Sequence, residues 1–196
     1  MKAVLISIQP KWCEKIANGE KTIEVRKTHP KLETPFKVYI YCTNDRKVFF
    51  DSDCNNKFWT EKNYGGKHYY NGKVIGEFVC DRIDSYVGRD DNKDYWDLSV
   101  EEWEELKKKS CLTIPQILEY TGDCCRCYGW RITDLKIYDK PKELSEFKKQ
   151  NVCYKSGDWE TLGCWEGGCV QQELGECDGR CSVLERPPQS WCYVEV

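Results

Sequence analysis

The sequence has no long hydrophobic run, and its 196 residues include only two histidines and one methionine. No stretch approaches the ~20 apolar residues that cross a bilayer. The apolar run near the N-terminus ends at Gln9-Pro10, and it lacks the longer apolar region and cleavage site of a secretory signal. We therefore expect a cytoplasmic protein with no membrane partner.

The scarcity of histidine also narrows the catalytic options. A cysteine nucleophile needs a nearby base, and His29 and His68 both lie in predicted loops. Of the possible cysteine–histidine catalytic pairs, Cys13 with His29 is the one that the sequence leaves open. No glycine-rich loop of the Walker type is present, and the acidic segment 90–94 lacks the spacing of a calcium loop.

Cysteine, by contrast, is abundant, with fourteen in the chain. A reducing cytosol keeps thiols free, so this number indicates metal ligation. Four thiolates in a glycine-rich stretch predict a structural zinc site, closed to water, that orders a segment without a core of its own. The alternative is a flexible insert with free thiols. The predicted ligands are Cys164, Cys169, Cys177 and Cys181, with Cys153 as an alternate and Cys124, Cys125 and Cys127 as further thiols that could reach the same region.

Charge is unevenly distributed along a chain whose net charge is −3. Residues 1–31 carry seven Lys or Arg against three Glu, whereas residues 81–105 carry ten Asp or Glu against three Lys or Arg. A local basic face favours localised anion binding over general adhesion to nucleic acid.

Hydrophobic periodicity predicts short strands and helices that do not alternate regularly along the chain. The strands are expected at 3–8, 21–27, 36–43, 73–83, 128–138 and 187–196, and the helices at 11–18, about 100–109 and 113–122. Without βαβ alternation, this order favours an α+β fold with a small mixed β-barrel and peripheral helices. We expect a single domain over 1–196, in which 150–186 is the Cys-rich insert and 187–196 the closing strand.

The segment 21–27 carries the polar residues with the clearest chemical potential. Strand alternation places Ile23 and Val25 on one face and Glu24 and Arg26 on the other. Cations beside a carboxylate could hold a phosphate and contact a base edge. The alternative is a solvated strand face with a surface ion pair worth at most ~1 kcal/mol. Aromatic residues that could stack on bases, or could instead fill the core, are Trp12, Tyr41, Trp130 and Trp191.

Residues 7–27 resemble the signature of the ASCH domain, a family in the PUA-like superfamily of small β-barrels. The matching residues are Ser7-Ile8-Gln9-Pro10, Glu14 and 19–27. The resemblance extends through 39–43 and 74–79, and Tyr128-Gly129-Trp130 and 188–194 are similar to the phage-associated and bacterial branch. The resemblance implies a basic cleft beside the barrel that binds RNA or a modified nucleobase. The implied ligand-binding residues are Ser7, Lys21, Glu24, Arg26, Lys27 and Tyr41.

One branch of that family is an amidohydrolase that deacetylates N4-acetylcytidine. Its catalytic set is a Lys, a Thr three residues later and a Glu before the second helix. Lys21 matches the first, Glu24 stands at the Thr position, and 107–111 offers no carboxylate. We therefore expect a binding module. The alternatives are an amidohydrolase or ribonuclease that uses Lys21 and Glu24, and an adaptor that binds a protein partner through the Cys-rich insert.

Overall fold

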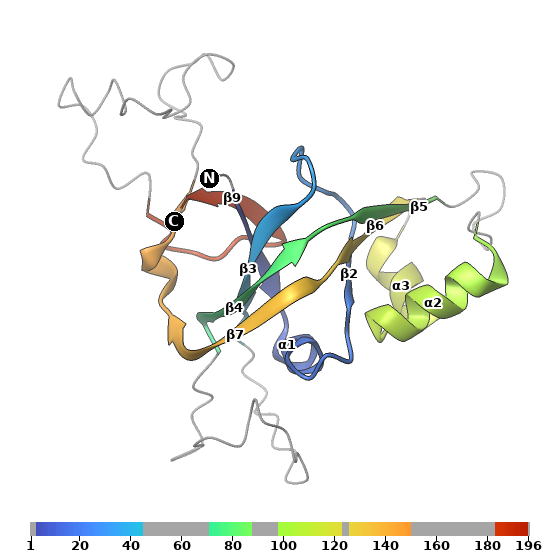
Figure 1. The fold of residues 1–196 in the computed structure, drawn as a ribbon, viewed down its shortest axis with the longest axis horizontal. Helices are drawn as coiled ribbons and strands as arrows, with labels where there is room; N and C mark the ends of the chain where they lie inside the picture. The colour runs from blue at the N-terminus through green and yellow to red at the C-terminus, as the bar shows by residue number, and fades with distance from the viewer. Residues whose placement is uncertain (1–2, 45–70, 88–97, 123–125, 150–182, 196) are drawn as a thin grey trace, which may run out of the picture.

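The structure is a computed structural model that describes residues 3–44, 71–87, 98–122, 126–149 and 183–195. These residues form two β-sheets with helices at their sides (Figure 1). The larger sheet has the order β7-β4-β3-β1-β9-β8, in which β1 and β3 are parallel and all other pairs antiparallel. Its strands are β1 Ala3–Ile8, β3 Phe36–Cys42, β4 Lys73–Cys80, β7 Thr133–Lys142, β8 Lys148–Lys149 and β9 Trp191–Glu195.

The smaller sheet has the order β2-β6-β5 and is antiparallel throughout. Its strands are β2 Ile23–Arg26, β5 Ile83–Val87 and β6 Arg126–Arg131. Only Ile132 separates β6 from β7, so the chain passes directly from the smaller sheet into the larger one. The described strands thus form two sheets that Ile132 connects, and the mixed α+β class is confirmed.

The central strand β1 is buried on both faces, which explains its continuous apolar run. Val4, Ile6 and Ile8 pack into the main core, together with Trp130 and the buried side of helix α1 (Pro10–Ala17). Leu5 points the other way, into a second cluster on the far side of the sheet. Pro10 begins α1, one residue before the predicted start, and Gly19, with φ +74°, follows its end.

Two further helices, α2 (Val100–Ser110) and α3 (Ile114–Thr121), cover the smaller sheet at one side of the molecule (Figure 1). Both begin with a capping box, at Ser99 and at Thr113. Their buried faces contribute Leu106 and Ile117 to a third cluster, which also holds Ile23, Val25 and Cys127 of the sheet. A short 3₁₀ helix, η2 (Leu144–Glu146), precedes β8.

Two local predictions differ from the structure. The stretch expected to be one strand at 128–138 is two strands in different sheets, because β6 pairs with β2 and β5 whereas β7 pairs with β4. Residues 83–87, of which the sequence placed 84–87 in a loop, form β5 against β6, which shows that cross-strand pairing overrides weak local patterning here.

The predicted insert lies almost wholly outside the described residues, and so do all five predicted zinc ligands. Its last residues are described: Val183 bridges Lys148, and the Leu184 amide donates to the Phe147 carbonyl at 3.0 Å. In the described parts of the chain, no helix has the length and apolar character needed to cross a membrane.

Candidate ligand-binding pocket

A pocket of about 930 Å³ lies where β2 faces the end of β1. Its walls come from the start of α1, from α3 and from the segment before β9. The polar residues on its inner side are Ser7, Lys21, Glu24 and Arg26, and Lys27 lies at its rim. Segments far apart in the sequence therefore meet at this pocket. The parallel pairing of β1 with β3 holds the end of β1 in place beside it.

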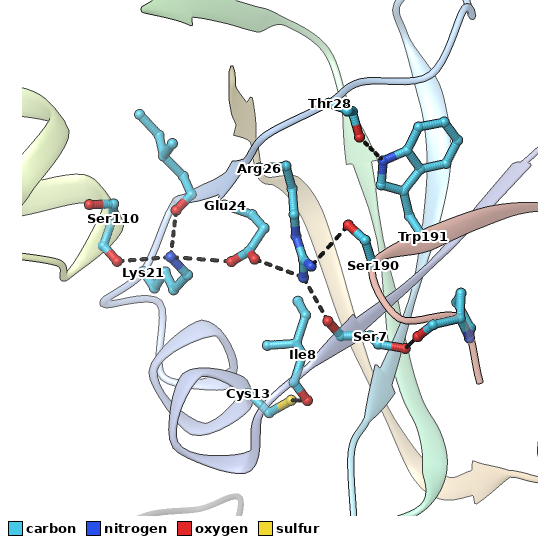
Figure 2. A network of polar contacts seen from close by, with 12 residues as sticks. Ser7, Ile8, Cys13, Lys21, Glu24, Arg26, Thr28, Ser110, Ser190 and Trp191 are labelled. Carbon is cyan, nitrogen blue, oxygen red and sulfur yellow. Dashed lines mark hydrogen bonds and ion pairs between the residues drawn. The ribbon is translucent and has the colours of Figure 1, made fainter. Parts of the chain in front are cut away.

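Glu24 lies between two cations inside the protein (Figure 2). One carboxylate oxygen is 3.2 Å from Lys21 Nζ, and the other is 2.9 Å from an Arg26 Nη atom. Glu24 and Arg26 are each only 7% exposed, and Lys21 is 2% exposed. A buried carboxylate flanked in this way is fixed in position, and about two of its four lone-pair sites remain for another donor.

Lys21 has an acceptor for each of its three ammonium protons. Besides Glu24, Nζ donates to the carbonyl of Ile23 at 2.9 Å and to that of Ser110 at 2.8 Å. Ser110 is the last residue of α2, so Lys21 satisfies a carbonyl at the negative end of that helix. Lys21 thereby ties α2 to β2 and serves as a fixed positive charge.

Arg26 joins the two sheets where no strand ladder connects β2 to β1. It donates to the Ser7 carbonyl at 2.6 Å and contacts Ser190 Oγ at 3.4 Å (Figure 2). Ser7 Oγ in turn donates to the carbonyl of Pro188 at 2.6 Å. Within the described structure, the buried Arg26 Nε has no hydrogen-bond partner, so one donor at the pocket remains available to a water or a ligand atom.

The alternative of a solvated strand face is wrong for β2, whose four residues are all buried, although Lys27 beyond it is exposed. Ile23 and Val25 pack on α2 and α3, whereas Glu24 and Arg26 face β1, so both faces of β2 are covered. Glu24 lies directly across from Trp130, which is fully buried in the main core. Residues paired in this way point to the same face, so the charged pair borders the hydrophobic interior.

The rim of the pocket combines aromatic rings with exposed cations. Lys11 Nζ lies 4.6 Å from the centre of the Trp12 ring, and buried Lys21 lies 5.5 Å from the same ring. On the opposite wall, Lys27 Nζ lies 5.6 Å from the Tyr120 ring of α3. Such contacts hold the rings in place and make the rim basic.

Five of the six predicted ligand-binding residues line this pocket, and Tyr41 does not. Tyr41 alternates with Cys42 on β3, and its side chain packs into the second cluster, on the far side of the sheet. Of the other predicted stacking residues, Trp130 is a core residue, Trp12 lines the pocket, and Trp191 donates through Nε1 to Thr28.

Several lining residues were not anticipated. Gln116, Glu119 and Tyr120 come from α3, and Pro187 to Gln189 come from the segment before β9. Their sequence pattern indicates a helix face and a turn, and only the packing of α3 against β2 brings them to the pocket. No local signal in the sequence could have identified them.

The structure does not support the Cys13–His29 pair. Cys13 is buried and donates from Sγ to the Ile8 carbonyl at 3.5 Å, and its burial, together with the neighbouring Cys42, raises its pKa well above the ordinary range. His29 is directed elsewhere, with its ring against Tyr128 and Nδ1 3.0 Å from the Pro30 carbonyl. Among the described residues, no three metal-ligating side chains are placed to share an ion.

Comparison with solved structures gives a fold match. The ASCH protein of Zymomonas mobilis superposes with a TM-score of 0.53 at 16% identity, over 98% of this chain and 87% of that one. Two mutant forms of the same protein match at 15% identity, with TM-scores of 0.54 (100% of this chain, 91% of that one) and 0.53 (98% and 88%). No family model and no curated protein matches the sequence.

These matches establish the fold class of the protein. The chain has the fold of an ASCH domain, as the residues at 7–27 indicated. At this level of identity the likeness concerns the fold alone, so the role of the pocket must be argued from its own residues.

Proposed function

We propose that the pocket binds RNA or a modified nucleobase without converting it. The observation that carries this proposal is the buried carboxylate of Glu24, held between Lys21 and Arg26 on the inner wall of a pocket with aromatic sides. A fixed carboxylate can accept from the exocyclic amine of a base such as cytosine. Trp12 and Tyr120 offer ring faces for stacking, worth ~1–3 kcal/mol per base.

The exposed cations at the rim supply the complementary part of the site. Lys11 and Lys27 can contact phosphate oxygens, which position a nucleic acid without selecting its sequence. Together with the buried pair, the pocket lining holds four cationic residues against Glu24 and Glu119. The excess of positive charge favours an anionic ligand even though the chain as a whole is acidic.

Binding can be tested at the rim, where substitutions leave the buried network intact. We expect Lys11→Ala and Lys27→Ala each to weaken binding of a fluorescein-labelled single-stranded RNA octamer and to reduce its salt dependence by about 0.7 in slope. Fluorescence anisotropy between 50 and 300 mM salt measures both quantities. The control is Lys136→Ala, an exposed lysine of β7 outside the pocket. Equal effects of all three variants, or an affinity that does not change with salt, would contradict the proposal.

Hydrolysis of an N4-acylated cytidine or of RNA is the alternative, and one observation favours it. Thr43 and Glu119 line the same pocket as Lys21 and Glu24, so a hydroxyl and a second carboxylate are present that the local sequence around Lys21 did not provide. Incubation with N4-acetylcytidine and with single-stranded RNA tests this alternative. Turnover that is lost in Thr43→Val or Glu119→Gln would replace the binding proposal with an enzymatic one.

A further inference from the structure

A second pocket, of about 630 Å³, is lined by the segment that follows β2 and by residues at β5 and β6. It shares no lining residue with the first pocket. The two are nevertheless neighbours, because Arg26 of the first pocket pairs directly with Tyr128 of the second across β2 and β6. Paired residues of this kind have Cβ atoms only about 5 Å apart.

We propose that this second pocket is a nucleotide subsite, and that the ligand is single-stranded RNA spanning both pockets. The inference rests on the proposed function and specifies the class of its ligand. The RNA chain would run from the first pocket over Lys27 and Thr28 to His29. A free nucleoside would occupy the first pocket alone.

The second pocket contains the groups that hold a stacked nucleotide. The rings of His29 and Tyr128 lie 4.4 Å apart at 57°, with His29 exposed and Tyr128 half-buried beneath it. A base can stack on such a platform whatever its sequence, because every base has a π face. The platform is part of the scaffold, since Tyr128 also packs against the main core.

Arg82 lies on the rim of the same pocket with an oriented guanidinium group. Its Nε and one Nη atom contact the two oxygens of Asp84, at 2.8 and 3.0 Å. This bidentate pair leaves the other Nη donors for a phosphate oxygen. Glu33, also on the rim, offers an acceptor for a base amine.

The segment between the two pockets is anchored and basic. Trp191 Nε1 donates to Thr28 Oγ1 at 3.0 Å (Figure 2), and the Lys31 amide donates to the Tyr193 hydroxyl at 2.8 Å. Both anchors come from β9, so the segment is fixed to the larger sheet. The exposed side chains of Lys27, His29 and Lys31 follow its outer surface, where a phosphate backbone would pass.

The experiment compares two probes on the full chain. Calorimetry measures binding of cytidine and N4-acetylcytidine, and anisotropy measures binding of a labelled single-stranded RNA octamer of mixed sequence. We expect the octamer to bind at least tenfold more tightly than either nucleoside. His29→Ala and Tyr128→Leu should weaken octamer binding by about fivefold or more, as expected for loss of one stacked base, and should leave nucleoside affinity within twofold.

Two controls separate this inference from the proposed function. Tyr120→Leu, in the first pocket, should weaken both probes, and the thermal unfolding midpoint shows whether Tyr128→Leu remains folded. Because His29 is exposed, His29→Ala tests the platform even if the Tyr128 variant unfolds. Octamer affinity that does not exceed nucleoside affinity, or that is unchanged in His29→Ala, overturns the second subsite while the first pocket stands. If neither probe binds, both proposals are wrong.

Discussion

At the scale of single residues, the balance of charge around Glu24 governs stability as well as binding. Both cations that face it are buried, so removing the carboxylate would leave Lys21 and Arg26 without a counter-charge. We expect Glu24→Gln to lower the free energy of unfolding by about 3–5 kcal/mol, the usual cost of breaking a buried pair by removing one partner. Urea denaturation monitored by circular dichroism measures this change.

The matched control is an exposed ion pair formed by two residues close to Lys21 in the sequence. Lys15 and Glu20 are 2.9 Å apart, and both side chains are more than a third exposed. Because solvent screens this pair, Glu20→Gln should cost at most ~1 kcal/mol. Similar losses in the two variants would show that burial gives the Glu24 network no special weight.

Residue by residue, the sequence indicated which charged residues lie together at this pocket, but not what surrounds them. Lys21, Glu24 and Arg26 were predicted as a ligand-binding set and lie together in the pocket. Their burial could not be predicted, because it comes from segments far away in the sequence or in another sheet: Arg26 donates to Ser7 of β1, and Lys21 donates to Ser110 of α2. Tyr41 was predicted as a ligand-binding residue but packs into the second cluster. Alternation along a strand assigns side chains to two faces, but it does not show which face borders the pocket.

At the scale of elements, the layer formed by β2, β6, α2 and α3 makes a prediction about alkaline pH. Cys127 of β6 is fully buried in the cluster beneath the helices, and this burial raises its pKa from 9.0 to about 12. Between pH 9 and 12 the unfolded state therefore loses the thiol proton while the folded state keeps it. The stability that the neutral thiol supplies is complete below pH 9 and falls as pH rises.

Denaturation at pH 8 and pH 10 tests this linkage. We expect the free energy of unfolding to fall by about 1 kcal/mol more in the wild-type protein than in Cys127→Val, which keeps an apolar side chain and removes one titrating group. Cys80, whose pKa is also raised to about 12 by burial, contributes equally to both proteins and cancels in the comparison. An identical fall in the two proteins would mean that Cys127 ionises as readily in the folded state as in the unfolded one.

The elements themselves were largely predictable, and their sheet membership was not. Periodicity located β1, β3, β4 and the three helices to within a few residues. It could not show that the stretch from 126 to 142 divides at Ile132 between two sheets, because each half has its own cross-strand partners, in β2 and β5 for one and in β4 for the other. Such partners are set by tertiary packing rather than by local propensity.

At the scale of the whole molecule, the described residues that flank 150–182 in the sequence are neighbours in the structure. Lys148 bridges Val183, and Leu184 hydrogen-bonds to Phe147, so the two ends of that segment lie side by side in the sheet. The chain that makes up the two pockets can therefore be joined across this point without stretching it. A shorter connection also lowers the entropy cost of closing the loop.

Excision of that segment separates the predicted zinc site from the rest of the fold. The sequence predicts that the full chain carries about one zinc, held by thiolates among Cys164, Cys169, Cys177 and Cys181. A variant in which four Gly or Ser residues replace 150–182 should contain no zinc. It should unfold at a urea midpoint close to that of the full chain and should bind the RNA octamer with the same affinity.

Metal analysis, denaturation and anisotropy measure the three outcomes. Zinc retained after excision would place the ligands elsewhere, and a loss of RNA binding would make the segment part of the site.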